Sequence, residues 1–557
     1  MSKLSKQSTY EINYRKIVTS RNVVFRRLIS VWDSKMKNAV TVILIVLTTI
    51  HHGSCAKILG VFSASGRSHY ILDSALMKAL AEKGHDVTVI SAHGEKEPPK
   101  TKGTYTNIVV TEILESRKQM MKQYNTNMFD REDVNPFLST VFMGLFMPKM
   151  LEATLQNEEV QKLIHSNEKF DAVIAEQFFS DADKALATHF GAPLIVLSAV
   201  GANSWVNTIV GNPSPTSYIP MLQTDYSVPM TFCERLVNSL LYVFGQIFFD
   251  LVVYPNENAK IQKSIPNGPD ISDVLYNASI VLMNSHPSLN QPVPYVPNMI
   301  DIGGFHVQPP KKLPQDLQEF LDNAKDGVVY FSMGSNLKSA DFPPEKRDAI
   351  LRTLSKLKEQ VLWKWEEDVL PGQPKNVKLS KWLPQQDILA HPNVKLFITH
   401  GGFLSTTETV YHGVPILAIP IFGDQKLNAR TAMDNGFGLV LPYQEITEDK
   451  FTQSIQEILT NPKYRNNAKK ISETFHDRQV GPMETAIYWV EYVIRHKGAP
   501  HLRVAGLDLP WYQYYLLDVL GFLVLVSTVV VCISYYSIKA VCKKICNKRK
   551  TKKLKQK

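Results

Sequence analysis

Short apolar runs alternate with helical patterns along most of the chain. The runs suited to strands buried on both faces are Lys57–Phe62, Asp86–Ser91, Phe170–Glu176, Pro193–Ser198, Val328–Ser332, Gln360–Trp365, Val394–Thr399 and Val414–Phe422. Between them, apolar residues recur at helical spacing, as from Ile71 to Leu80, where Lys83 and Gly84 end the helix. Buried parallel strands joined by helices predict an α/β protein with two doubly wound domains.

Two changes of composition divide this pattern. The stretch Pro292–Pro314 is dense in proline, which indicates a linker, so we place an N-terminal domain at 57–295 and a C-terminal domain at 296–500. Residues 199–230 are rich in Gly, Asn, Pro and Ser and predict a long functional loop. The apolar stretch Met230–Tyr254 fits either a buried helix pair or a helix that contacts a membrane or lines a ligand site.

The N-terminus has the pattern of a targeting segment. Residues 1–38 are basic, and Ala39–Ile50 is an apolar run followed by small residues up to Ala56. This pattern predicts a signal peptide over 36–56, cleaved after Ala56 and preceded by an extension over residues 1–35. An uncleaved signal anchor is the alternative, although the apolar run is too short to span a bilayer comfortably.

The C-terminus predicts a membrane anchor. The aromatic segment Leu509–Tyr515 precedes Leu516–Ile538 (516–538), which is long enough to span a bilayer, with a buried core helix as the alternative. Residues 539–557 carry ten Lys or Arg and no acid, so the positive-inside rule places this tail in the cytosol and the body in the lumen. The final K-L-K-Q-K resembles a dilysine retrieval signal of the endoplasmic reticulum, with a solvated charge run as the alternative.

The net charge of +10 belongs to the two ends of the chain. Residues 1–38 contribute +7 and the tail +10, so the 500 residues between them sum to −7, and the charge does not indicate a nucleic-acid partner. Cys233 is the one cysteine in the body; we expect a buried thiol without an intrachain disulfide, intermolecular pairing being the alternative. Asn277 begins an N-A-S sequon, as expected of a lumenal glycoprotein.

The stretch Trp382–Gln425 carries the candidate chemistry. Its first strand, Val394–Thr399, ends in His400-Gly401-Gly402, where small residues let the backbone approach a ligand closely. Ser405 and two threonines fall in the first turn of the following helix, and Gly423-Asp424-Gln425 ends the next strand. Helix N-termini attract phosphate, and ligands bind at the carboxyl ends of parallel strands. The stretch therefore predicts a nucleotide-phosphate pocket.

The same stretch resembles the signature of the UDP-glycosyltransferases. W-x-P-Q, H-G-G, Glu408 and the terminal D-Q match in order and spacing, and the resemblance covers residues 57–557. The segments F-S-M-G-S-N and K-W-L-P-Q-Q-D-I-L-A-H-P are similar to those of the arthropod branch of this family. The resemblance implies two facing Rossmann-like domains (GT-B architecture) plus one C-terminal transmembrane helix. It also implies that the last body helix, Glu484–Lys497, crosses back onto the first domain.

The resemblance implies a role for each donor-site residue. Trp382 would stack on uracil, Gln385 would bond the edge of the base, and Glu408 would hold the ribose hydroxyls. The other implied contacts are His400, Gly402, Ser405 and Ser335 for the diphosphate, and Asp424 and Gln425 for the sugar hydroxyls. Backbone N–H groups and a helix N-terminus would offset the charge of the departing diphosphate, so we expect no metal and no other cofactor.

The resemblance also implies a catalytic base. His69 follows the polar loop after the first strand, and in the family a histidine at this position takes the proton of the acceptor hydroxyl. Relatives support it with an aspartate at the end of the strand that here finishes in Ala175-Glu176. Either Glu176 or Asp181, five residues further on, could serve instead, and both remain candidates.

The implied function is that of an inverting hexosyltransferase. We expect transfer from a UDP-sugar, with UDP-glucose favoured over UDP-glucuronate, to small lipophilic hydroxyl compounds, as in detoxification. The enzyme would be a single-pass type I protein of the endoplasmic reticulum membrane; homo-oligomerisation stays open. Glycosylation of an endogenous lipid, or non-catalytic binding of a UDP-sugar or lipophile, are the alternatives. The loops at 92–160 and 199–230 would set the acceptor.

Overall fold

The computed structural model describes residues 55–554, except 96, 98, 124–127 and 133. The predicted extension and nearly all of the predicted signal peptide, to residue 54, lie outside the described residues. The same holds for the last three residues of the predicted retrieval signal.

The first sheet is parallel throughout and doubly wound. Its strands, in spatial order, are β3 (Tyr105–Val109), β2 (Asp86–Ser91), β1 (Lys57–Phe62), β4 (Ala172–Glu176), β5 (Leu194–Ser198), β6 (Ala278–Met283) and β7 (Met299–Asp301). The strand order reverses between β1 and β4, which opens a crevice beyond their carboxyl ends. Strand β7 belongs to the first sheet although it follows the predicted boundary at 295, so this edge strand lies inside the proline-dense stretch Pro292–Pro314 read as a linker.

The second sheet repeats the arrangement. Its parallel strands, in spatial order, are β10 (Val377–Ser380), β9 (Gln360–Lys364), β8 (Val328–Ser332), β11 (Val394–Thr399), β12 (Ile416–Ala418) and β13 (Gly438–Val440). The order reverses between β8 and β11. Strand β12 is shorter than the predicted Val414–Phe422, because the residues after Ala418 turn away from the sheet toward the second crevice.

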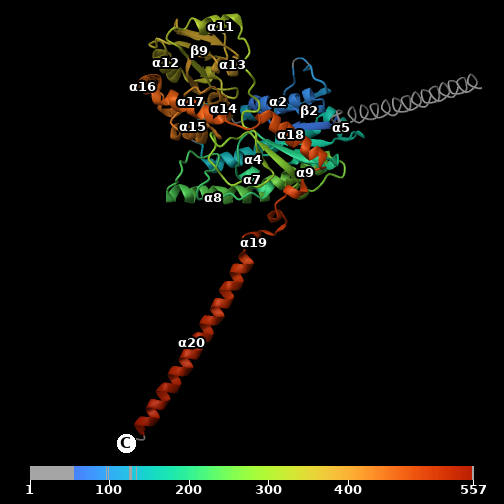
Figure 1. The fold of residues 1–557 in the computed structure, drawn as a ribbon, viewed down its shortest axis with the longest axis vertical. Coiled ribbons are helices and arrows are strands. Elements are labelled where there is room, and N and C mark those ends of the chain that lie inside the picture. Colours follow the sequence, from blue (N-terminus) through green and yellow to red (C-terminus); the bar gives the residue numbers. More distant parts are fainter. Residues whose placement is uncertain (1–54, 96, 98, 124–127, 133, 555–557) are drawn as a thin grey trace, which may run out of the picture.

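Helices cover both faces of each sheet, which explains why the strands read as continuous apolar runs (Figure 1). Those of the first domain are α2 (Arg67–Lys83), α3 (Glu112–Gln123), α4 (Pro136–Gln156), α5 (Glu158–Ile164), α6 (Ala185–His189), α7 (Ser204–Val210), α8 (Phe232–Phe248), α9 (Tyr254–Ser264) and α10 (Ile271–Leu275). Those of the second domain are α11 (Gln315–Asp322), α12 (Pro344–Leu354), α13 (Gln385–Leu389), α14 (Phe403–His412), α15 (Gln425–Asp434), α16 (Glu448–Thr460) and α17 (Pro462–His476).

Two segments cross between the domains. Helix α18 (Pro482–Arg495) returns to the first domain, where Ala486, Val490 and Val493 join the core beside α2, as the resemblance implied (Figure 1). In the opposite direction, Phe129 of the first domain is fully buried in the second, where its ring stacks on those of Phe342 and Tyr443, with ring centroids 4.5 and 5.1 Å away. Each domain therefore contributes side chains to the core of the other side of the interface, through α18 in one direction and Phe129 in the other.

Two local predictions in the first domain are wrong. The sequence of Gln177–Ala187, with Asp181 and Asp183 early, predicts the start of a helix, but no helix begins at Gln177. The chain instead makes a turn through Phe179, whose φ is 55°, before the short helix α6. The apolar residues after Glu176 fill the crevice wall instead of one helix face. The predicted loop 199–230 contains α7, which Asn203 caps by accepting from the N–H groups of Trp205 and Val206.

Helix α8 is amphipathic and turns an apolar stripe to the outside. Of the two alternatives for Met230–Tyr254, the buried helix pair does not hold, since one face of α8 and of the π-helical residues after it, Phe249–Val253, is exposed. Its exposed apolar side chains are Phe232, Leu236, Leu240, Val243, Ile247 and Leu251. Cys233 is also exposed and free, so the expectation of a buried thiol is wrong. Only the opposite side, with Asn238 and Leu241, packs inward.

The chain ends in a long helix that leaves the body. After α19 (Trp511–Tyr514), α20 (Leu517–Leu554) extends away without contacting the core (Figure 1). Among the described residues, Leu517–Arg549 and Phe232–Ser264 are long and apolar enough to cross a membrane. The first has none of its apolar window buried in the protein, so α20 has the character of a single-pass membrane anchor, whereas the second packs partly into the first domain.

Candidate active site

The two crevices created by the strand-order reversals face each other and form one cavity of about 1630 Å³. The turns after β1 and β4 line it from the first domain, and the turns after β8 and β11 line it from the second. Open parallel sheets bind ligands at such switch points. All predicted donor-site residues and His69 line this cavity, whereas Glu176 and Asp181 do not.

His69 and Glu176 form a pair at the first switch point. His69 lies in the first turn of α2, and its Nδ1 bonds the carboxylate of Glu176 at the end of β4. Glu176 is buried, with 3% of its side chain exposed, and the ring of Phe178 packs 4.3 Å from that of His69. Because Nδ1 is engaged, Nε2 is the nitrogen left for a substrate.

Asp181 does not approach His69. Its carboxylate accepts from Lys184 and, at 3.1 Å, from the amide of Gln177, inside the protein. Its backbone N–H donates to Glu257 at 3.0 Å. Of the two candidate acids, the structure thus places Glu176 on His69 and Asp181 in a separate buried ion pair.

The pKa of His69 is raised. Burial lowers this pKa, but the charge and hydrogen bond of Glu176 outweigh burial, and Asp424 from the second domain acts in the same direction. Burial also raises the pKa of Asp424, partly offset by its bond to Asn428. His69 and Asp424 therefore influence each other electrostatically across the cavity.

His400 stays neutral at the second switch point. Burial, and then the charge of Lys364, lower its pKa to about 4, so it offers a neutral imidazole to a ligand. Its ring fits between two glycines, where a Cβ at either Gly334 or Gly402 would lie 2.5 Å from it. Gly334 also has a φ of +81°, which favours glycine. The glycines thus leave room for the imidazole.

The N-terminus of α14 holds Asp424 and faces the cavity. Asp424 Oδ2 accepts from the N–H of Phe403 at 3.2 Å and from Asn428 at 2.6 Å. Gln425 Oε1 accepts from the N–H groups of Ile421 and Phe422, at 2.8 and 3.2 Å, so its amide nitrogen is the atom left for other contacts. These bonds fix both side chains of the predicted D-Q motif at the cavity wall.

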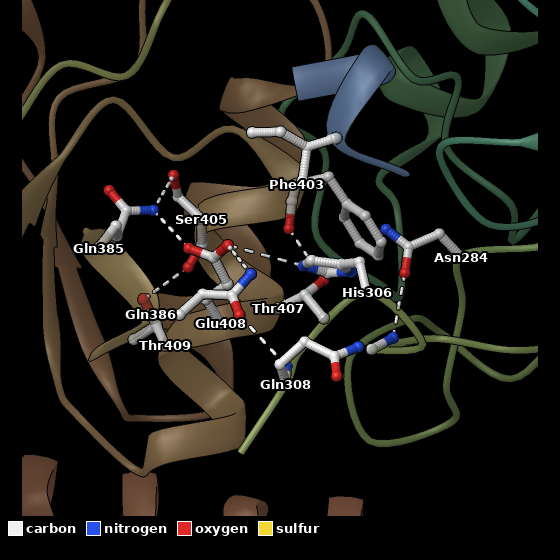
Figure 2. A network of polar contacts seen from close by, with 12 residues as sticks. Asn284, His306, Gln308, Gln385, Gln386, Phe403, Ser405, Thr407, Glu408 and Thr409 are labelled. Carbon is white, nitrogen blue, oxygen red and sulfur yellow. Dashed lines mark hydrogen bonds and ion pairs between the residues drawn. The ribbon is translucent and has the colours of Figure 1, made fainter. Parts of the chain in front are cut away.

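A polar network joins α13 to α14 around Glu408 (Figure 2). Gln385 Nε2 donates to Glu408 Oε2 at 2.6 Å and to Ser405 Oγ at 3.0 Å, and Gln386 Nε2 donates to Glu408 Oε1 at 3.1 Å. Glu408 is buried, with 3% of its surface exposed. The hydroxyl of Tyr330 donates to Gln385 Oε1 at 3.2 Å. Three predicted donor-site residues are therefore in direct contact before any ligand is bound.

Residues 56–553 match the sequence profile of the family described as UDP-glucoronosyl and UDP-glucosyl transferase. The chain belongs to the UDP-glycosyltransferase family. It is 41% identical over 502 residues to UDP-glycosyltransferase UGT5 of the insect Dactylopius coccus, covering 88% of this chain and 93% of that one. It is 35% identical over 501 residues to UDP-glucosyltransferase 2 of the same species, with the same coverages. It is 30% identical over 469 residues to UDP-glucuronosyltransferase 2C1 of Oryctolagus cuniculus, covering 82% of this chain and 92% of that one.

Family membership makes this chain a UDP-glycosyltransferase enzyme with a UDP-sugar as donor substrate, and its two parallel Rossmann-like sheets are the GT-B fold. Among the described residues there is no group of three or more His, Cys, Asp or Glu side chains placed to hold a metal ion.

Trp382 and Ser335 lie at the open edge of the cavity. Trp382 is 53% exposed, and the guanidinium of Arg67 from α2 lies 5.0 Å from its ring centroid, so the two domains meet across this indole. Ser335 lies in the turn after β8 and is exposed. Among the described residues, neither side chain makes a hydrogen bond.

Sequence reasoning missed residues in two parts of the cavity. Arg67 and His306 line it but follow no motif, since Arg67 lies two residues before His69 and His306 lies in the region read as a linker. The apolar wall of the first domain lies largely in the two regions expected to set the acceptor, 92–160 and 199–230, but its individual residues were not identified, because they come from separate helices and turns. They include Leu138, Phe142, Met143, Phe178, Phe179, Trp205 and Leu222.

Proposed function

We propose that this chain transfers glucose from UDP-glucose to a hydroxyl group of small lipophilic acceptors, with inversion at the anomeric carbon. The observation that carries the proposal is the single cavity lined by His69 from one domain and the donor motif from the other. His69 Nε2 takes the proton of the acceptor hydroxyl as its oxygen bonds to C1, and the bond from C1 to the phosphate oxygen breaks to release UDP. Glu176 stabilises the imidazolium that forms.

The proposed donor contacts follow the positions of the side chains. Trp382 offers an indole face to uracil at the cavity edge, and Glu408 lies one turn into α14, where ribose hydroxyls would reach a buried carboxylate. The turns carrying Ser335, His400 and Gly402, with Ser405, surround the N-terminus of α14, which suits a diphosphate. Asp424 and Gln425 lie between that N-terminus and His69, where the sugar would be transferred.

The acceptor half of the cavity supports a lipophilic substrate. Aromatic and aliphatic side chains of α4, α7 and the turn after β4 surround the approach to His69. Such a wall binds apolar rings through burial and offers few polar groups to discriminate between them. Detoxification of varied hydroxyl compounds fits this wall.

The donor preference is tested directly. Membranes from cells that express the chain are offered labelled UDP-glucose or UDP-glucuronate together with a panel of phenols. We expect a β-glucoside product with UDP-glucose and at least tenfold lower kcat/KM with UDP-glucuronate, about 1.4 kcal/mol of discrimination. Preference for UDP-glucuronate would contradict the donor assignment. Transfer from neither donor, with UDP still bound, would favour a non-catalytic binding protein, and transfer only to membrane lipids would favour an endogenous acceptor.

We also propose that the body lies in the lumen of the endoplasmic reticulum, anchored by α20. The exposure of Asn277, which begins the sequon, supports this orientation. Helix α8, which carries the exposed stripe, lies on the side of the body from which α20 leaves (Figure 1), and Tyr242 of α8 interacts with Tyr515 next to α19. The apolar stripe would then rest on the bilayer surface.

Removal of the anchor should reveal this second membrane contact. A chain that ends at Asp508 should still bind phospholipid vesicles, because α20 makes no core contact and α8 remains. Replacing Leu236, Leu240 and Ile247 by Gln should abolish most of that binding in a vesicle flotation assay. Val369→Gln, at a 69% exposed apolar position in the second domain, is the matched control and should bind as the parent does. Equal binding by the triple variant would exclude α8 as a membrane contact.

A further inference from the structure

The turn that leads from the first domain into the second is fixed at its start. The N–H of Gly303 donates to the carbonyl of Ser285 at 2.9 Å, and the N–H of Gly304 donates to the side chain of Asn284 at 3.1 Å. A Cβ at Gly303 would meet the backbone of Ser285 at 2.5 Å, so the two segments are in close contact. The position of the turn, and of His306 two residues later, is therefore set by the end of β6.

The residues that follow His306 are hydrogen-bonded to the second domain. The N–H of Gln308 donates to Gln386 Oε1 at 3.2 Å, and the N–H of Lys311 donates to Asp387 Oδ1 at 2.7 Å. His306 thus lies between two anchored points, one on each domain. Gln386 is also a donor to Glu408, so the turn and the donor-site carboxylate share a partner (Figure 2).

The imidazole of His306 is buried without a hydrogen bond. Its side chain has no exposed surface, and neither ring nitrogen has a hydrogen-bond partner among the described residues. Its Nε2 lies 3.6 Å from Glu408 Oε1, close enough for electrostatic attraction but too far for a hydrogen bond (Figure 2). Burying an imidazole in this way costs free energy, which suggests that a partner becomes available in another state of the site.

Gln385, whose amide donates to Glu408, is needed at the edge of the base once the nucleotide binds. In the proposed complex, Gln385 turns its amide to the edge of uracil, which takes the 2.6 Å bond away from Glu408. A buried carboxylate left with fewer donors lacks hydrogen bonds that its oxygens need and loses the contacts that fix its orientation. His306 lies on the Oε1 side of Glu408, away from Gln385, and needs to approach by less than an ångström to form a hydrogen bond.

We propose that His306 is a positioning residue of the donor site. Its Nε2–H donates to the Glu408 carboxylate when Gln385 turns to the nucleotide, and this bond keeps the carboxylate aimed at the ribose hydroxyls. Because the turn carrying His306 is fastened to both domains, ribose binding and the relative position of the domains are linked. This inference rests on the proposed function, specifically on Glu408 as the ribose contact.

The test compares binding of UDP and of 2′-deoxy-UDP to the full-length protein by isothermal titration calorimetry. His306→Ala should weaken UDP binding about tenfold or more, since a hydrogen bond to a charged group is worth about that factor. Binding of 2′-deoxy-UDP should weaken clearly less, because a ribose hydroxyl that Glu408 would hold is absent. His306→Gln, which keeps an N–H donor, should recover part of the UDP affinity.

Two outcomes would overturn the inference. Equal weakening of UDP and 2′-deoxy-UDP binding by His306→Ala would show a general structural effect, as would failure of His306→Gln to recover affinity. His286→Ala is the matched control, because His286 lies in the same interdomain region, 4.9 Å from the ring of Phe475, without lining the cavity. It should bind both nucleotides as the parent does. If the parent protein itself did not bind UDP, the proposed function would fail instead.

Discussion

Replacing His69 by Ala should lower kcat by about 10²–10⁴-fold, the range that a positioned general base contributes. UDP affinity should be unchanged, because His69 lies on the first domain and the donor motif lies on the second. The reason for the loss is geometric. Glu176 holds Nδ1 of His69, so that Nε2 alone can accept the proton of the acceptor hydroxyl. The measurement is kcat at saturating donor and acceptor, with UDP binding followed by calorimetry.

The control for this variant is a second histidine of the same domain. His93 contacts the carbonyl of Ser65 at 3.2 Å and packs 5.5 Å from the ring of Tyr70, but it does not line the cavity. His93→Ala should therefore keep kcat within a few-fold of the parent. If His69→Ala were as active as His93→Ala, His69 would have no part in the mechanism.

Much of the fold could be predicted because buried parallel strands leave a simple signal. Strands such as β1, β2, β8 and β11 begin and end where their apolar runs do, since both faces of each sheet are covered. The apolar pattern misled where apolar residues line a cavity or face outward and do not pack between a helix and a sheet. Phe178 and Phe179 line the cavity from a turn and not from a helix, and the stripe of α8 faces outward.

The donor half of the site could be predicted because it is nearly contiguous in sequence. Trp382 to Gln425 spans two adjacent strands and the helix between them, and the motif brings all its members to one edge of the sheet. His306 could not be found in this way, because its place beside Glu408 depends on where the linker turn is anchored. The choice between Glu176 and Asp181 also depends on the turn at Phe179, which sends Asp181 back into the interior.

Replacing Glu176 by Gln is the second substitution for which we expect a large effect on the rate. Glu176→Gln keeps a side chain that can accept from His69 Nδ1 but removes its charge. Since burial lowers the pKa of His69 and Glu176 raises it, the variant should have a lower His69 pKa than the parent. A general base acts when neutral, so the rate rises with pH through this pKa, and the acidic limb of the pH–rate profile should move to lower pH. At the plateau kcat should fall about 10²-fold, because the imidazolium formed in the transition state loses its counter-charge.

Asp181→Asn distinguishes the role of Asp181 from that of Glu176, because we expect it to lower stability without moving the pH–rate profile. Asp181 pairs with the fully buried Lys184, so loss of its charge should destabilise the protein by about 3–5 kcal/mol, the usual cost of breaking a buried ion pair. Its pH–rate profile should coincide with that of the parent, measured below the lowered melting temperature. Glu176→Gln should show the opposite combination, a shifted acidic limb with a nearly unchanged melting temperature. A shifted limb in Asp181→Asn, with none in Glu176→Gln, would transfer the supporting role to Asp181. That result would require the turn at Phe179 to rearrange when substrate binds, because in this structure Asp181 and His69 lie on opposite sides of it.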